Sequence, residues 1–109
     1  MADYKEAARL HGEFTESGDH KATNKAHDKI ATIYAELRHR GEDAQRKLLP
    51  LLRDRDPSVR CWAAAHALDF APHEGAPVLQ SLAQNQCGFL GFGAKMTLRE
   101  WEAGRLRFP

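Results

Sequence analysis

The 109-residue chain predicts an all-α domain of about six helices that pair into three hairpins. Strand signals are scarce, because β-branched residues are few and no Asn-Gly or Asp-Gly hairpin turn occurs. Apolar residues recur at helical spacing between segments that contain glycine, proline or aspartate. The length suits one domain with a single modest core rather than two independent cores.

The first hairpin is expected over residues 1–41, where it would cover the N-terminal end of the other two hairpins. Its first helix should cover about residues 3–16 and end near Gly18. Asp19 can then cap a second helix at about residues 20–40, because its carboxylate can accept a hydrogen bond from a free N–H of the first turn. The basic end of that helix suits a C-terminus, where cations meet the negative end of the helix dipole.

The second hairpin is expected over residues 42–71 and carries the clearest pattern in the chain. Pro50 should kink or fray its first helix, because proline lacks the N–H that a helix interior needs. Asp56-Pro57 suits a helix start, with aspartate as the N-cap and proline in the first turn. The core residues expected in the helix that follows are Val59, Ala63, Ala64, Ala67 and Leu68.

The string from Leu48 to Leu68 resembles the hairpin of HEAT repeats, in which a leucine-rich helix, an Asp-Pro turn and an alanine-rich helix follow one another. The resemblance implies a HEAT-like right-handed stack of three helical hairpins, an α-solenoid fragment. Residues 72–104 would form a degenerate repeat and residues 105–109 a short tail. It also implies that Arg60 pairs with an acidic turn residue of a neighbouring repeat.

The order of the elements along the chain points to one family among proteins with HEAT-like repeats. A tyrosine-bearing helix, a glycine turn, the DPSVR–AA hairpin and a final helix with MTLREWEAG resemble a small bacterial family, the domain of unknown function DUF2019, over roughly residues 6–105. The family supplies no catalytic residues to transfer. Some small helical-repeat proteins of this kind are encoded beside polymorphic toxins. The resemblance therefore implies a non-catalytic immunity protein that binds and occludes a cognate toxin domain.

A shift of 30 residues superimposes the second hairpin on the last one and predicts a partner-binding surface. In HEAT stacks the second helix of each hairpin lines the inner, binding face. The candidate partner-binding residues on that face are Trp62, His66, Asp69, Phe92, Lys95 and Arg99. Tryptophan and arginine are frequent in binding hot spots. In the alternatives, Trp62 covers the edge of the first hairpin, or Phe92 completes the core of the last one.

No sequence motif points to catalysis, a metal site or a cofactor. His20, Asn24 and His27 share a helical face, but two histidines without a third ligand favour a solvated polar face. Cys61 and His66 lie too far apart around their helix to act as a nucleophile–base pair. We therefore expect a protein that is not an enzyme and that holds neither metal nor cofactor.

Charge and composition restrict the partner. The 16 basic and 15 acidic side chains argue against a dedicated nucleic-acid binder. Two alternatives remain: a self-associating structural subunit, and a nucleic-acid or nucleoprotein scaffold that uses the basic residues near the second turn. Those residues are Arg38, Arg40, Arg46, Lys47, Arg53 and Arg55. No apolar segment approaches the ~20 residues of a membrane span, and two unpaired cysteines suit a reducing compartment, so a cytoplasmic protein is expected.

Overall fold

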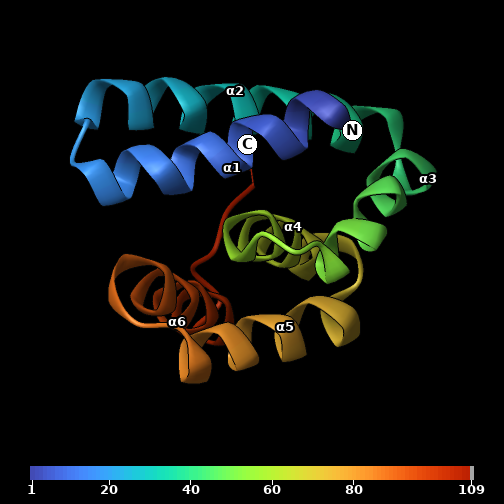
Figure 1. Cartoon of the computed structure of the whole chain (residues 1–109). Coiled ribbons are helices and arrows are strands. Elements are labelled where there is room, and N and C mark those ends of the chain that lie inside the picture. Colours follow the sequence, from blue (N-terminus) through green and yellow to red (C-terminus); the bar gives the residue numbers. More distant parts are fainter. Residues whose placement is uncertain (109) are drawn as a thin grey trace.

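The computed structural model describes residues 1–108. Its elements are α1 (Ala2–Ser17), α2 (His20–Arg40), α3 (Glu42–Gln45), the 3₁₀ helix η1 (Arg46–Arg53), α4 (Pro57–Phe70), α5 (Pro72–Asn85) and α6 (Gly88–Glu102). Figure 1 shows α1 and α2 on one side, α5 and α6 on the other, and α4 between them. No strand occurs in the described residues, so the predicted all-α class is confirmed. Within the same residues, no helix is both long and apolar enough to span a membrane.

The connection between α1 and α2 is set by local backbone chemistry. Gly18 adopts a left-handed φ of 78°, a conformation that costs glycine little. The backbone N–H groups of Gly18 and Asp19 then donate to the carbonyls of Thr15 and Phe14 at the end of α1. The Asp19 carboxylate accepts a hydrogen bond from the N–H of Ala22 at 3.0 Å, so the predicted cap of α2 is confirmed.

The third predicted helix is divided into the short α3 and the 3₁₀ helix η1. Pro50 lies inside η1 and has no N–H to donate to a carbonyl one turn earlier. The disturbance expected at Pro50 therefore takes the form of a tighter helix rather than a kink. Leu48 is nevertheless fully buried, so the segment still contributes to the core.

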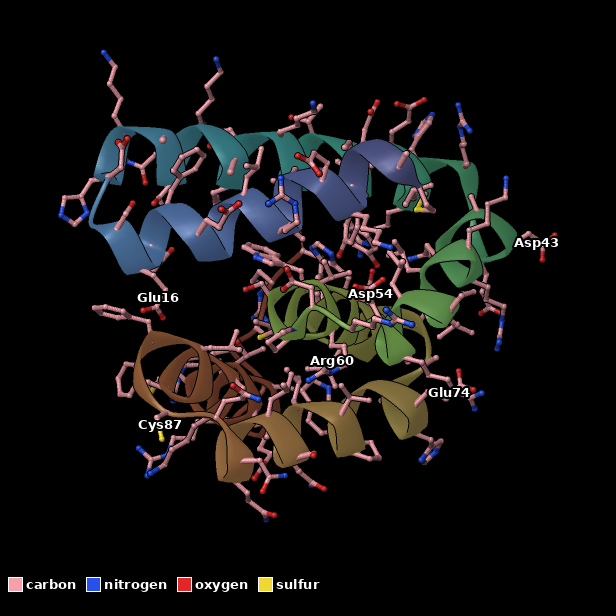
Figure 2. All side chains as sticks on the ribbon, in the orientation of Figure 1. Glu16, Asp43, Asp54, Arg60, Glu74 and Cys87 are labelled. Carbon is pink, nitrogen blue, oxygen red and sulfur yellow. The ribbon has the colours of Figure 1, made fainter. Side chains whose placement is uncertain are left out.

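The start of α4 follows the prediction, while the predicted role of Arg60 is wrong. The Asp56 carboxylate accepts a hydrogen bond from the N–H of Ser58 at 2.7 Å, and proline occupies the first turn. The Arg60 guanidinium donates to the carbonyls of Asp54 and Arg55, at 2.7 and 3.1 Å. It thus closes the turn of its own hairpin, and within residues 1–108 it forms no ion pair with a neighbouring one. Arg60 and Asp54 are labelled in Figure 2.

Helix α4 lies between two apolar clusters and contributes to both. Val59 and Ala63 join the cluster formed with α1, α2 and η1, whereas Ala64 and Leu68 join the cluster formed with α5 and α6. All five core residues predicted in α4 are at most 4 % exposed, which confirms that prediction. Close contact with α5 depends on Gly75, where an added Cβ would lie 2.6 Å from the Ala64 carbonyl oxygen.

The chain after α6 returns across the molecule toward α2 (Figure 1). Phe108 packs against both apolar clusters, and its carbonyl accepts a hydrogen bond from the Arg38 guanidinium at 3.2 Å. The short tail predicted at residues 105–109 is therefore packed as far as Phe108, and Pro109 lies outside the described residues.

Gly91 and Gly93 lie two residues apart in α6 but should respond oppositely to alanine. An added Cβ at Gly91 would lie 2.0 Å from the carbonyl oxygen of Gln86, whereas at Gly93 it would meet no atom within 4 Å. We expect Gly91→Ala to lower the free energy of unfolding by about 1–3 kcal/mol through overpacking. Gly93→Ala should raise it by up to about 1 kcal/mol through helix propensity. Urea unfolding followed by circular dichroism measures both, and equal effects would contradict this placement of α6.

Candidate functional site

The six candidate partner-binding residues do not form one exposed surface. His66 is only 8 % exposed, so the prediction that it faces a partner is wrong. Its ring stacks on Tyr34 with a centroid separation of 3.9 Å and an interplanar angle of 3°. The Tyr4 hydroxyl lies 2.7 Å from His66 Nδ1 and has no other hydrogen-bond partner in the described residues, so we assign the hydroxyl as the donor. Packing of the first hairpin onto α4 is the physical reason that His66 is buried.

Burial also determines the protonation of this cluster. Removal from water lowers the pKa of His66 to about 3, and the nearby His27 adds to the effect. Burial raises the pKa of Tyr4 well above its ordinary value. At neutral pH the pair is therefore a neutral imidazole that accepts from a neutral phenol, a stable structural contact.

Asp69 is likewise directed into the protein, which corrects the prediction that it faces a partner. Its Oδ2 accepts hydrogen bonds from the Tyr34 hydroxyl at 2.6 Å, the Arg38 Nε at 2.9 Å and the Gln45 Nε2 at 3.2 Å. Burial and the bond to Asp69 raise the pKa of Tyr34 above its ordinary value. These three hydrogen bonds thus tie α4, which carries Asp69, to α2 and α3.

Trp62 packs on the first hairpin, as the alternative interpretation predicts. Its ring meets the rings of His11 and His27 edge-on, with centroid separations of 5.1 and 5.5 Å. The side chain is half-buried against the first apolar cluster. Burial and His27 lower the pKa of His11, so this ring adds no positive charge at neutral pH.

Two kinds of reactive group were sought among the described residues: a cluster of metal ligands and a nucleophilic Cys61 thiol. No group of three or more His, Cys, Asp or Glu side chains among residues 1–108 is arranged to hold a metal ion. Burial raises the pKa of the Cys61 thiol to about 11. The thiol is therefore protonated at neutral pH and is a poor nucleophile.

A half-open groove of about 770 Å³ lies where α1, α4 and α6 meet. It is lined by residues within 9–17 of α1, 56–65 at the start of α4, and 86–97 around the start of α6. Glu16 and Cys87 lie at one end of it, on opposite sides (Figure 2). The volume falls in the range of sites that bury a small ligand or a few side chains of a partner. We call this feature the groove.

The groove is apolar at its floor and acidic at its rim. Its lining includes the apolar or small side chains of Cys61, Trp62 and Ala65 together with three carboxylates and one guanidinium. The guanidinium of Arg9 is already paired with Glu6 and Glu13 along α1. Glu16 is exposed and forms no ion pair within residues 1–108, so its charge is available at the rim.

Beside the groove, α6 exposes two large aromatic side chains. Phe89 is 66 % exposed and Phe92 is 64 % exposed, so the alternative that Phe92 completes the core is wrong. Lys95 and Arg99 follow at helical spacing, which places them on the same side of the helix as Phe92. Both are exposed and form no ion pair with residues 1–108. We call these four residues the α6 face.

Sequence reasoning identified part of this region. Phe92, Lys95 and Arg99 were candidate residues, whereas Phe89, Glu16 and the groove were not. The spacing of Phe89 and Phe92 was a usable signal, because residues three apart lie on the same side of a helix. The groove itself joins segments too distant in sequence to be recognised from periodicity.

Comparison with known proteins gives the family. No curated protein and no solved structure matches the chain significantly. The model of a family described as a domain of unknown function, DUF2019, matches residues 7–102. Because this match covers most of the chain, the protein belongs to the DUF2019 family.

Proposed function

We propose that the chain is a non-catalytic protein-binding module, in which a HEAT-like stack of helical hairpins presents the α6 face to a partner. The observation that carries the proposal is the exposure of Phe89 and Phe92 on one side of a single helix. Apolar aromatic side chains at the surface gain free energy when a partner removes them from water. The neighbouring Lys95 and Arg99 favour a partner surface that combines apolar and acidic side chains.

The partner that we propose is a cognate toxin domain, which a cytoplasmic immunity protein would occlude. Two features support this choice. The α6 face belongs to a helix packed on both α4 and α5, so it is preorganised and loses little entropy on binding. Its charges lie beside the aromatic pair, which allows matching to one particular toxin.

The nucleic-acid alternative receives less support from the basic residues near the second turn. Arg38 pairs with Asp69, Arg40 with Glu36 and Arg46 with Glu42, at 2.9, 2.8 and 3.1 Å. Those three guanidinium groups are therefore partly neutralised before any phosphate could approach. A gel shift that weakens with salt would favour this alternative over a protein partner.

The test first identifies the partner and then measures how substitutions in the α6 face change its affinity. Proteins that co-purify with the tagged chain from its native cell are identified by mass spectrometry, and the purified partner is titrated by calorimetry. We expect Phe92→Ala to weaken binding by about 30-fold or more, the loss typical of a hot spot. Its thermal unfolding should be unchanged, because the side chain is mostly exposed.

Arg99→Ala and Arg53→Ala form a matched pair of exposed arginines on different helices. Only the first should weaken the complex. Growth of cells that express the partner as a toxin should be restored by the wild-type chain and less by Phe92→Ala. Unchanged affinity of both Phe92→Ala and Arg99→Ala would refute the proposed binding surface.

A further inference from the structure

Three helices surround the groove and place Glu16 at its rim. Helix α1 rests on the start of α4 at Gly12, where an added Cβ would clash with the side chain of Ser58. Gly12 and Glu16 are one helical turn apart, so both lie on the side of α1 that faces α4. Glu16 therefore lies beside the groove, about 6 Å along α1 from the contact with Ser58. Helix α6 forms the remaining wall with Gly93 and Thr97.

The interior of the groove is open at Gly93. This residue is half-buried in the groove wall, its φ is ordinary, and an added Cβ would meet no atom within 4 Å. Glycine is a poor helix former, and neither a clash nor the backbone conformation requires it at this position. A larger side chain would extend into the groove, so the glycine leaves that volume available to a ligand.

The walls of the groove favour a ligand with an apolar body. Trp62, Phe89 and Leu90 contribute large apolar side chains to the lining. The Cys61 thiol is neutral, because burial raises its pKa to about 11. An apolar group that packs against these side chains leaves water, which is favourable. The volume of about 770 Å³ is typical of sites for small organic molecules, in which a few polar groups fix the orientation of the ligand.

The polar groups of the groove carry an excess of negative charge. Asp56 is held in place as the N-cap of α4: its Oδ1 accepts a hydrogen bond from the first turn at 2.7 Å, and its Oδ2 has no partner within residues 1–108. Glu16 is likewise unpaired within these residues. Arg9, the guanidinium of the lining, already pairs with two glutamates of its own helix.

The positive contributions to the groove are smaller than this excess. The N-termini of α4 and α6 both reach the lining, and each adds a partial charge of about +0.5. At α4 this partial charge is matched by Asp56. The His11 ring adds no positive charge at neutral pH, since burial and His27 lower its pKa. With three carboxylates and one guanidinium in its lining, the groove is therefore complementary to a cation and not to an anion.

We propose that the groove binds a small organic cation, whose apolar group lies against Trp62 and Leu90 and whose ammonium lies at the rim that carries Asp56 and Glu16. Such a ligand suits both the apolar walls and the unpaired carboxylates. A neutral apolar ligand would leave the carboxylates unpaired, and an anion would be repelled by them. The proposal goes beyond the binding of a protein at the α6 face, because it needs neither Phe92 nor Arg99.

Three probes of similar size and different charge test the class of ligand: 3-phenylpropylammonium, 3-phenylpropan-1-ol and 3-phenylpropanoate. Each is titrated at pH 7 into the ¹⁵N-labelled wild-type chain, and the amide signals are followed by two-dimensional NMR. We expect the ammonium to bind with a Kd of about 1 mM or lower and to shift the signals of residues within 9–17, 56–65 and 86–97. The alcohol should bind about tenfold more weakly, the carboxylate more weakly still, and salt should reduce the difference.

Removal of charge from the rim should weaken binding of the cation alone. Asp56→Asn keeps an oxygen for the N-cap of α4, and Glu16→Gln keeps the size of an exposed side chain. Each should raise the Kd of the ammonium about threefold and the double variant about tenfold, while the Kd of the alcohol stays unchanged. The matched control is Asp43→Asn, which neutralises an exposed carboxylate on the opposite side of the molecule from Glu16 (Figure 2). It should leave every Kd unchanged.

Filling the groove should weaken binding of the ammonium and the alcohol together. Gly93→Leu places a larger side chain where an added Cβ meets no atom within 4 Å, so the chain should still fold. Circular dichroism checks the fold of this variant. The Kd of both probes should rise by about tenfold or more, because the leucine occupies volume that the phenyl group needs.

Three outcomes overturn the cation site: no shift in the groove with the ammonium up to about 10 mM, an alcohol or carboxylate that binds as tightly as the ammonium, or a double variant with the wild-type Kd. The second outcome would assign the groove to a neutral or an anionic ligand. Phe92→Ala and Arg99→Ala should leave the Kd of the ammonium unchanged. Failure of the cation site and failure of the protein-binding α6 face are therefore detected separately.

Discussion

Replacing Tyr34 with alanine is expected to lower the free energy of unfolding by about 3–5 kcal/mol, the cost of removing a large buried aromatic side chain. The residue is 1 % exposed and lies in the first apolar cluster. Its ring stacks on His66, and its hydroxyl donates to Asp69 and accepts from Gln45 at 2.9 Å. The substitution therefore removes packing between α2 and α4 as well as the centre of a buried polar network.

Tyr34→Phe separates these two contributions. It keeps the ring and the stack on His66 but removes the hydroxyl, so we expect a smaller loss of about 1–2 kcal/mol. Asp69 would keep its hydrogen bonds from Arg38 and Gln45. Urea unfolding monitored by tryptophan fluorescence and circular dichroism measures both variants. Equal losses for alanine and phenylalanine would show that the hydroxyl, and not the ring, stabilises this contact.

Acidification from pH 7 to pH 4.5 is expected to destabilise the fold by about 2–3 kcal/mol through His66 alone. Burial lowers the pKa of His66 to about 3 in the folded chain, against an ordinary value near 6.5. Between these two values the unfolded chain binds a proton that the folded chain does not. The contribution of His66 to the free energy of unfolding is therefore fully present above about pH 6.5, and it decreases as the pH falls toward 3.

Unfolding titrations at the two pH values, on the wild type and on His66→Gln, test this dependence. The variant lacks the titrating ring but keeps a polar side chain, so the difference between pH 7 and pH 4.5 should shrink by about 2–3 kcal/mol. The remaining dependence belongs to other groups, such as His11, whose pKa is also lowered by burial. A difference of the same size in both proteins would mean that His66 is not buried as a neutral ring.

Local sequence was sufficient to predict most of the helices and the buried face of α4. Asp19 and Asp56 cap the helices that they were expected to cap, because capping depends on a side chain and the few residues beside it. Ala63, Ala64 and Leu68 are buried where the apolar spacing places them. Helical periodicity identifies which residues share a face, and for these elements that was enough.

The direction of the polar face of α4 required the tertiary structure. Periodicity separates His66 and Asp69 from the alanines, but it does not state what covers the face on which they lie. In this fold Tyr4 and Tyr34 cover it, from helices more than 30 residues earlier in the chain.

The same reason applies to the groove and to the exposed end of α6. The groove joins residues within 9–17, 56–65 and 86–97, and no single segment carries its shape. Local patterns of residues were enough to predict that this chain is helical, where most of its helices begin, and several of the alanines and leucines that are buried. The packing of the first hairpin on α4 places His66 and Asp69 inside the protein, and the packing of α6 on α4 and α5 leaves Phe89 and Phe92 in water, because burial depends on contacts between distant segments.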